Sequence, residues 1–409
     1  MKRRSSILLL AGVCLLRLAA CLEAAGPDTL PDYTPWDLKA LSNAPPMKWL
    51  DRAGKVHSLL YEAEPYKGGK TRVFAYYASP ATVGADREQP KERYPGMVLV
   101  HGGSGHAFRN WAALYAKRGY AAIAMDLAGN IEEGKARRRL DDGGPPQDDH
   151  TKFRLSELPD KDQWTYHAVA DVILAHSLIR SFREVDPLRT GVIGISWGGY
   201  LTCIVAAVDH RFQAALPMYG CGYLHENSFW KGPQFPYMSA AWTKKWVRLW
   251  DPSSYVGCAT MPMLFVNGAN DPYYPLDSYA KTYARVKCPK NIRIEVDMPH
   301  GHRFDVKECL MFFDHHLQGA PALPQVGGLV VQGGRIRAEV RSRTALVSAR
   351  LHYTSGPHNQ NKTRKWLSRP LKIEGKRVVG EGPPAEGTVF FVTVEDRRGA
   401  MVSSEPVLR

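Results

Sequence analysis

Seven short runs of mostly apolar residues, separated by helix-length stretches, constrain the fold of this chain more than any other feature. The runs are residues 71–77, 96–100, 121–125, 191–195, 213–218, 262–267 and 292–297. Strands that are apolar along their whole length are typical of a parallel sheet buried on both faces. The alternation therefore predicts an α/β fold, a mostly parallel sheet flanked by helices, and residues 71–320 have a suitable length for one such domain.

The stretches between the runs carry helical patterns. Residues 164–182 place apolar side chains on roughly one helix face, and residues 303–317 supply a last helix. Two connections are much longer than the others. Residues 127–163 are polar, which indicates a surface excursion, whereas residues 220–260 are rich in Trp, Tyr and Phe. Loops of this length inside a compact domain are usually lids or binding elements.

The first twenty residues have the pattern of an export signal. Lys2-Arg3-Arg4 precede a short apolar stretch at 7–16. The sequence Leu18-Ala19-Ala20-Cys21 resembles the bacterial lipobox, in which the Cys is lipidated, although Arg17 departs from that pattern. We therefore expect a periplasmic or cell-surface protein attached to the membrane through Cys21. Ordinary cleavage near Ala20 or Ala25, without a lipid, is the alternative.

Two further regions flank the α/β domain. Residues 21–70 form a polar lead-in. After a Pro-rich junction, residues 326–409 alternate between apolar and polar side chains, with Gly-rich turns and no helical stretch. That pattern predicts a small C-terminal all-β, sandwich-like domain.

The charge and the cysteines narrow the possible partners. The net charge falls from +14 to +10 once the four bases of the export signal are discounted. The remaining bases are scattered, so we expect no nucleic-acid interface, and an anionic polysaccharide or membrane surface is the more natural partner. No apolar run is long enough for a polytopic membrane protein. Five cysteines lie outside the signal, at positions 203, 221, 258, 288 and 309.

The spacing of those cysteines does not favour a metal site. It includes no CxxC pair and no Cys/His pattern typical of zinc, so we expect no metal site. Cys221 and Cys258 flank the aromatic segment and are candidates for a disulfide in an oxidising compartment. The equal alternative is five small buried side chains.

The sequence Gly194-Ile195-Ser196-Trp197-Gly198-Gly199 is the strongest catalytic signal. It follows one of the apolar runs and precedes the helix-compatible residues 200–207. A strand, a sharp turn and a helix are what a nucleophile elbow requires, and glycines leave room around the strained Ser. Ser196 is therefore the candidate nucleophile.

A Ser nucleophile needs a base that is oriented by an acid. In chains where the Ser lies on such an elbow, the acid follows the Ser in the sequence and the His comes last. Asp271 directly follows the run at 262–267, and Asp277 is the reserve candidate. Pro299-His300-Gly301-His302 offers two bases. We choose His302 as the base, because Gly301, His302 and Phe304 form a Gly-His-x-Phe pattern, which is the more typical sequence around such a histidine. His300 is then a neighbour in the pocket.

Donors for an oxyanion are expected in two places. His101-Gly102-Gly103-Ser104-Gly105 follows the run at 96–100 and has the composition of an oxyanion loop. We assign one donor to the N–H of Gly103, with Ser104 as the alternative, and the other to the N–H of Trp197. His101 is expected to hold the loop rather than to move protons.

Together these motifs make residues 71–320 resemble the α/β-hydrolase superfamily. The chain looks most like the bacterial acetyl-xylan-esterase and dienelactone-hydrolase-like members, which neighbour the prolyl-oligopeptidase-type peptidases. The residues that carry the finer match are 71–77, 98–103, 118–122 and 194–200. Dienelactone hydrolases proper use a Cys nucleophile, so Ser196 argues for an esterase. The resemblance implies a Ser-His-Asp triad, an acyl-enzyme and no cofactor.

The aromatic segment is the one clue to the substrate. Trp230, Trp242 and nearby Tyr273 are candidates to stack on sugar rings, although such aromatics also suit the core of a lid. The sequence thus predicts a secreted serine esterase acting on short-acyl (acetyl) esters of carbohydrate. A prolyl-oligopeptidase-type peptidase, a lipid or xenobiotic carboxylesterase and a catalytically silent binding protein are the alternatives.

Overall fold

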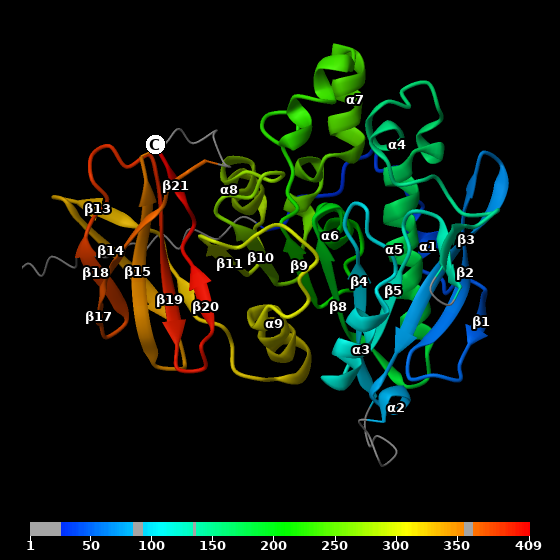
Figure 1. The fold of residues 1–409 in the computed structure, drawn as a ribbon, viewed down its shortest axis with the longest axis horizontal. Coiled ribbons are helices and arrows are strands. Elements are labelled where there is room, and N and C mark those ends of the chain that lie inside the picture. Colours follow the sequence, from blue (N-terminus) through cyan, green and yellow to red (C-terminus); the bar gives the residue numbers. More distant parts are fainter. Residues whose placement is uncertain (1–25, 85–92, 134–135, 356–362) are drawn as a thin grey trace, which may run out of the picture.

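The computed structural model of the chain describes residues 26–84, 93–133, 136–355 and 363–409. The expected export signal and Cys21 lie outside the described residues. Within those ranges, no helix is both long enough and apolar enough to cross a membrane. Figure 1 shows a central sheet flanked by helices, with the C-terminal strands gathered at one end.

The central sheet confirms the α/β prediction. Its parallel part has the order β5-β4-β8-β9-β10-β11. The strands are β4 (Tyr94–Val100), β5 (Ala121–Met125), β8 (Val185–Ile195), β9 (Ala214–Met218), β10 (Met263–Gly268) and β11 (Lys290–Glu295). On the other side of β5 three antiparallel strands follow, namely β3 (Gly69–Ala78), β2 (His57–Tyr66) and β1 (Met47–Asp51). Each of the seven predicted runs forms a strand.

Helices cover both faces of this sheet. A Cβ at Gly96 of β4 would meet Ile179 of α5 (Trp164–Ser181), whereas a Cβ at Gly191 of β8 would meet Phe313 of α9 (Lys307–Gln318). The helix α6 (Trp197–Val208) packs beside α5, and α3 (Arg109–Lys117) packs beside α9. Helices thus cover both faces, so the strands are buried on both sides as their composition predicts.

The helix α5 is more buried than its pattern predicts. Residues 164–179 are all buried, rather than one face alone. The N-terminal segment covers the outer side, where the indole N–H of Trp36 donates to the Tyr166 carbonyl at 2.9 Å and the Ser177 hydroxyl donates to the Leu41 carbonyl at 2.7 Å. The polar lead-in is therefore part of the fold, through this cover and through β1 and β2.

Asp171 on α5 is buried in this environment, and one of its carboxylate oxygens has no hydrogen-bond partner among the described groups. Burial, with Glu64 and Asp126 nearby, raises the pKa of Asp171 well above its usual value. An Asp with a raised folded pKa lowers stability as pH rises above the unfolded value near 4. We expect Asp171→Asn to raise the free energy of unfolding at pH 7 by about 1–3 kcal/mol, and by much less at pH 3.5. Urea unfolding at both pH values measures this, and equal stability of the two proteins at pH 7 contradicts it.

The C-terminal region is rich in strands, as expected. Its strands β20 (Met401–Ser403), β19 (Val389–Asp396), β15 (Leu346–Thr354) and β16 (Leu367–Pro370) pair in one sheet. A second sheet has the order β12 (Gln325–Val326), β14 (Arg335–Arg341), β18 (Arg377–Glu381) and β17 (Lys372–Glu374). The sequence gives no sign of the link between the two regions. Ser403 of β20 pairs antiparallel with Ile292 of β11, so the first of these sheets continues the central sheet.

The two long connections form a single structure over the carboxyl ends of the parallel strands. We call the described residues of this structure the cover (residues 127–133, 136–163 and 220–260). Its helices are α4 (Asp149–Phe153) and α7 (Ala240–Trp250), which lie together at the top of Figure 1. Indole N–H groups join them: Trp242 donates to the Phe153 carbonyl at 2.6 Å, and Trp246 donates to the Lys152 carbonyl at 2.7 Å. Residues 127–163, predicted as a surface excursion, are thus also part of the cover.

The five described cysteines are free thiols, and all of them are buried. The disulfide considered between Cys221 and Cys258 does not form. The alternative, in which these residues are small apolar side chains, describes the structure. Burial raises the pKa of the Cys221 thiol well above its usual value, so this thiol is held in its unreactive protonated form.

Candidate active site

Ser196 lies at the sharp turn between β8 and α6. Its backbone has φ 60° and ψ −118°, a conformation that a non-glycine residue rarely adopts. The turn is held from the side, because the N–H of Ser196 donates to the Met218 carbonyl of β9 at 2.8 Å. This is the strained strand-to-helix turn that a nucleophile elbow requires.

The glycines of the motif are required by close backbone approaches. A Cβ at Gly194 would lie 2.0 Å from the Gly198 carbonyl oxygen. A Cβ at Gly198 would lie 2.0 Å from the Val100 carbonyl oxygen of β4. Since real atoms do not approach so closely, side chains at these positions would force the turn apart, and the crowding inferred from the sequence is confirmed.

Asp271, His300 and Ser196 form a hydrogen-bonded chain. Oδ2 of Asp271 lies 2.6 Å from Nδ1 of His300, and Nε2 of His300 lies 2.9 Å from Oγ of Ser196. The other carboxylate oxygen of Asp271 accepts from the N–H groups of Tyr273 and Tyr274 at 2.9 and 2.8 Å. Asp271 is fully buried, and these bonds fix it so that it orients the imidazole. The arrangement is that of a nucleophile, a base and an orienting acid.

The choice of His302 as the base was therefore wrong. The Nε2 atom of His302 accepts a hydrogen bond from the N–H of Gly102 at 3.0 Å, and its ring lies 4.8 Å from that of Phe108. Burial, together with nearby His101 and His300, lowers the pKa of His302 to about 4. His302 is thus a neutral acceptor that holds the glycine loop, and the predicted pocket neighbour His300 occupies the position of the base.

The reserve acid, Asp277, has a different role. Both of its carboxylate oxygens accept from the side-chain amide of Asn227, at 3.0 and 2.7 Å. Asp277 lies in the first turn of α8 (Leu276–Arg285), and Asn227 belongs to the cover. This pair therefore connects the cover to α8. Of the two predicted acids, Asp271 is the one that is bonded to a histidine.

The glycine loop after β4 lies directly against the nucleophile. A Cβ at Gly102 would be 2.9 Å from Cβ of Ser196, and a Cβ at Gly103 would be 3.0 Å from the Trp197 ring. The N–H of Gly102 is already bonded to His302, whereas that of Trp197 lies in the first turn of α6, where N–H groups have no intrahelical partner. Gly103 and Trp197 thus lie beside the reacting hydroxyl, and their role as oxyanion donors stays a prediction.

His101 holds this loop, as its sequence context indicates. Its Nδ1 lies 2.7 Å from the Gly102 carbonyl oxygen, and its Nε2 accepts from the N–H of Leu127 at 2.8 Å. Burial lowers the pKa of His101 to about 4, so the ring is neutral. A neutral ring bonded at both nitrogens to the backbone is a structural element rather than a proton carrier.

The three predicted substrate-binding aromatics separate into two groups. The Trp230 ring lies 4.6 Å from that of Trp197, and the Tyr273 ring lies 4.6 Å from that of His300, so both border the triad. Trp242 is buried in the cover, where it bonds the backbone of α4. Phe229, which the sequence analysis did not single out, is 42% exposed and stands 5.0 Å from Tyr273. It extends the aromatic surface outward from His300.

Lys152 brings a buried positive charge close to the elbow. Its side chain is 5% exposed, and its Nζ lies 4.7 Å from the centre of the Trp197 ring. The nearest carboxylate oxygen, on Asp149, is 3.7 Å away. Burial lowers the pKa of Lys152 to about 8. The ammonium group is therefore held mainly by indole faces at neutral pH, and it fixes α4 over the nucleophile.

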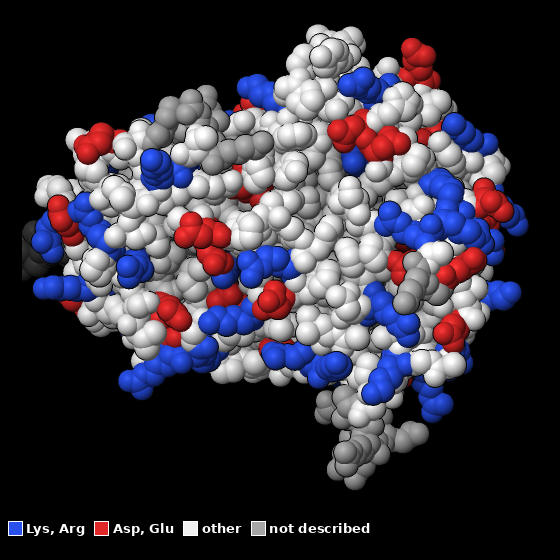
Figure 2. Space-filling model, in the orientation of Figure 1, with Lys and Arg blue, Asp and Glu red and all other residues white. Residues whose placement is uncertain are grey.

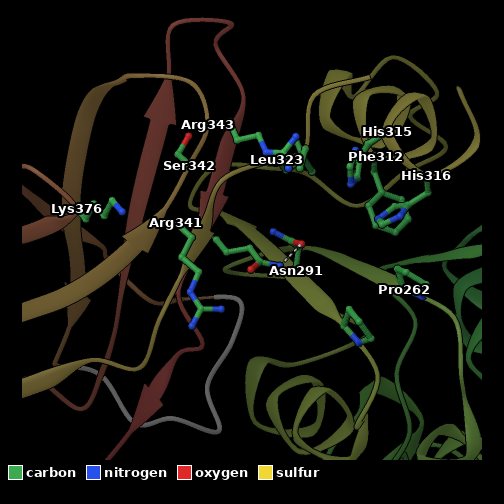
Figure 3. Close-up of a pocket in the computed structure, with 13 residues that line it drawn as sticks. Pro262, Asn291, Phe312, His315, His316, Leu323, Arg341, Ser342, Arg343 and Lys376 are labelled. Atoms are coloured by element: carbon green, nitrogen blue, oxygen red, sulfur yellow. Dashed lines mark hydrogen bonds between the residues drawn. The ribbon is translucent and has the colours of Figure 1, made fainter. Parts of the chain in front are cut away.

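A separate cavity of about 350 Å³ lies near the amino ends of the parallel strands, away from the triad. Figure 3 shows His316 and Phe312 of α9 on one side of it and Arg341 and Arg343 of the C-terminal region on the other. Its lining includes the prolines that precede β10 and β11, at the amino ends of those strands. Ser196 lies at a carboxyl end, where ligands bind in open α/β sheets. None of the residues that line this cavity belongs to the triad.

Among the described residues, no group of three or more His, Cys, Asp or Glu side chains is placed to hold a metal ion. Figure 2 shows Lys and Arg interspersed with Asp and Glu over the visible face, so no single stripe of positive charge crosses it.

Comparisons with known proteins show what this chain is similar to. The acetyl xylan esterase (AXE1) model matches residues 52–226, and the prolyl oligopeptidase family model matches residues 159–319. The uncharacterized peptidase YuxL of Bacillus subtilis (strain 168) is 24% identical over 209 residues, which are 47% of this chain and 28% of that protein. The chain thus spans well under half the length of that relative.

Two solved structures extend the comparison. The acetyl xylan esterase from Paenibacillus sp. R4 is 20% identical, with a TM-score of 0.54 over 68% of this chain and 92% of that one. Acetyl xylan esterase 1 from Thermoanaerobacterium sp. JW/SL YS485 is 17% identical, with a TM-score of 0.52 over 68% and 93%. At these identities, the likeness shows a shared fold.

The protein is an α/β-hydrolase. The family matches make it similar both to acetyl xylan esterases and to prolyl-oligopeptidase-type peptidases, two groups of serine hydrolases.

Proposed function

We propose that the protein is an exported serine esterase that removes short acyl groups, in the first place acetyl, from carbohydrate. The observation that carries the proposal is the hydrogen-bonded chain from Asp271 through His300 to Ser196. The match to the acetyl xylan esterase model includes the elbow and the glycine loop, and this supports an ester as the substrate.

The proposed reaction is acyl transfer in two steps. Ser196 Oγ attacks the ester carbonyl while its proton passes to Nε2 of His300, and the N–H groups of Gly103 and Trp197 bind the oxyanion. His300 then gives the proton to the leaving alcohol as the C–O bond breaks. Water then attacks the acyl-enzyme and gives a proton to His300; the Oγ–C bond breaks, His300 returns the proton to Oγ of Ser196, and the acid is released.

The surroundings of the nucleophile support a small acyl group. Ser196 is 8% exposed, and the indole of Trp230, from the cover, packs against the indole of Trp197. The more open side leads past Tyr273 to Phe229, whose ring is exposed. We place the acyl group at the enclosed indoles and the sugar along Tyr273 and Phe229, where flat rings offer a stacking surface.

A peptidase is the second candidate, because the prolyl oligopeptidase family model matches the half of the chain that contains the triad. A ladder of p-nitrophenyl esters from acetate to octanoate, with acetylated xylan and an aminoacyl-anilide, separates the two. We expect a clear preference for acetate, release of acetate from xylan, and loss of both in Ser196→Ala. Cleavage of the anilide without an ester preference would replace the esterase proposal by the peptidase one.

Export with a lipid on Cys21 is also a proposal, supported by the basic and apolar pattern of residues 1–16 and by Leu18-Ala19-Ala20-Cys21. We expect the mature protein to begin at Cys21, to carry the mass of a diacylglyceryl group and to sediment with membranes. In Cys21→Ala the mass increment should disappear. An unmodified mature chain beginning near position 26 would contradict the lipid.

A further inference from the structure

The hydroxyl of Tyr274 is a buried polar group that the triad leaves without a function. Tyr274 is fully buried, and among the described residues no group forms a hydrogen bond with its hydroxyl. Buried polar groups in folded proteins nearly always have a partner, because an unpaired one costs free energy. Because the unpaired hydroxyl of Tyr274 lies near the nucleophile, we looked for a partner that forms during the reaction.

The position of Tyr274 is closely fixed. Its N–H donates to Oδ1 of Asp271 at 2.8 Å, and its carbonyl accepts from the side-chain amide of Asn267 at 3.0 Å. Its ring lies nearly parallel to that of His300, with 6.2 Å between centroids and 18° between planes, and 5.3 Å from Trp230. The backbone bonds and the packed rings hold the side chain in one orientation, so the hydroxyl is preorganised.

The Ser196 side chain lies within interaction range of the Tyr274 hydroxyl. Burial raises the pKa of Tyr274 well above its usual value, and the neighbouring Ser196 side chain opposes this effect. Tyr274 is therefore a protonated, neutral donor over the whole pH range in which a serine hydrolase works. In the resting state Oγ of Ser196 pairs with His300 instead.

We propose that Tyr274 is a catalytic residue that donates its hydroxyl hydrogen bond to Oγ of Ser196 when this oxygen gains negative charge. The assignment rests on the proposed serine hydrolase chemistry. As the Oγ–H bond breaks, its proton moves to Nε2 of His300, the Oγ–C bond forms, and Tyr274 keeps its own proton throughout. Catalytic hydrogen bonds are often long in the resting enzyme and shorten in the transition state.

The proposal predicts help in both halves of the reaction. Oγ is the attacking atom in acylation and the leaving atom in deacylation, and it carries developing charge in both. A donor to the oxygen of the leaving alcohol would help acylation alone, and would matter most for poor leaving groups. The dependence on the leaving group therefore distinguishes the two positions.

The test is Tyr274→Phe, which removes one oxygen atom and keeps the packed ring. We expect kcat/KM to fall about 10- to 100-fold for p-nitrophenyl acetate, and by a similar factor for an alkyl acetate, since a hydrogen bond to a charged group is lost. Ser196 should react with an organofluorophosphonate more slowly by a comparable factor. The melting temperature should stay the same or rise, because an unpaired buried hydroxyl is removed.

The matched control is Tyr279→Phe. Tyr279 is also fully buried, but its hydroxyl points to the Pro217 carbonyl at 3.4 Å, away from the triad. Its rates should stay within about twofold of wild type. Wild-type rates in Tyr274→Phe, or a loss confined to the alkyl acetate, would overturn the assignment while the proposed function stands. A wild-type protein inert to both esters and to the probe would instead remove the proposed function on which the assignment rests.

Discussion

His300→Gln is expected to lower kcat/KM for ester hydrolysis by about 10⁴-fold or more, whereas His302→Gln costs about tenfold or less. The reason is geometric. Only His300 joins Asp271 to Oγ of Ser196, so its loss removes the base and the proton donor together. His302 instead accepts from the N–H of Gly102, and a glutamine amide oxygen can replace that acceptor.

Steady-state kinetics of both variants on p-nitrophenyl acetate measure this difference, with melting temperatures as the control for folding. His302→Gln should change KM and kcat slightly, because the glycine loop is loosened. The assignment of the base would be refuted by a ranking in the opposite order, with His302→Gln inactive and His300→Gln active.

Ser196→Ala is expected to reduce kcat by about 10⁴- to 10⁶-fold, because no acyl-enzyme can form without Oγ. The change removes one oxygen atom at a position where the backbone is already strained, so the fold should remain intact. A residual rate above that in buffer is expected if Gly103 and Trp197 bind the oxyanion, since such donors act without the nucleophile.

The double variant Ser196→Ala, His300→Gln sharpens this prediction. Residues that act as a unit are strongly non-additive, so the double variant should be no slower than Ser196→Ala alone. If the two losses multiplied instead, the two side chains would be acting in separate steps. Activity of Ser196→Ala close to wild type would place the nucleophile elsewhere.

The sequence predicts the fold of the core well, because parallel strands and the elbow leave local signals. Each apolar run became a strand, and the glycines around Ser196 proved necessary for close backbone approach. Asp271 was also found from its position directly after β10. These features depend on local composition and chain order, which the sequence contains.

The identity of the base is not a local property. His300 and His302 lie in one loop after β11, two residues apart, and each has a buried polar partner. What separates them is the direction of each ring, which is set by Asp271 and by Gly102 from distant parts of the chain. No spacing in the sequence records those contacts.

The joining of the two long connections into one cover, and the extension of the sheet, were not predicted for a similar reason. The indole N–H groups of Trp242 and Trp246 donate to backbone carbonyls of α4. Aromatic composition alone suggested that Trp242 binds sugar, whereas in the structure it packs inside the cover. Likewise, the pairing of β20 with β11 is a backbone contact between strands far apart in the chain. Edge pairing of this kind leaves little trace in side-chain pattern.

The central claim is that Ser196 is a nucleophile activated by His300. Intact-mass spectrometry after brief exposure to an organofluorophosphonate tests it most directly. The account predicts a single adduct that maps to Ser196, forms rapidly in wild type and in His302→Gln, and is nearly absent in His300→Gln. An adduct on another residue, or equally rapid labelling of His300→Gln, would contradict it.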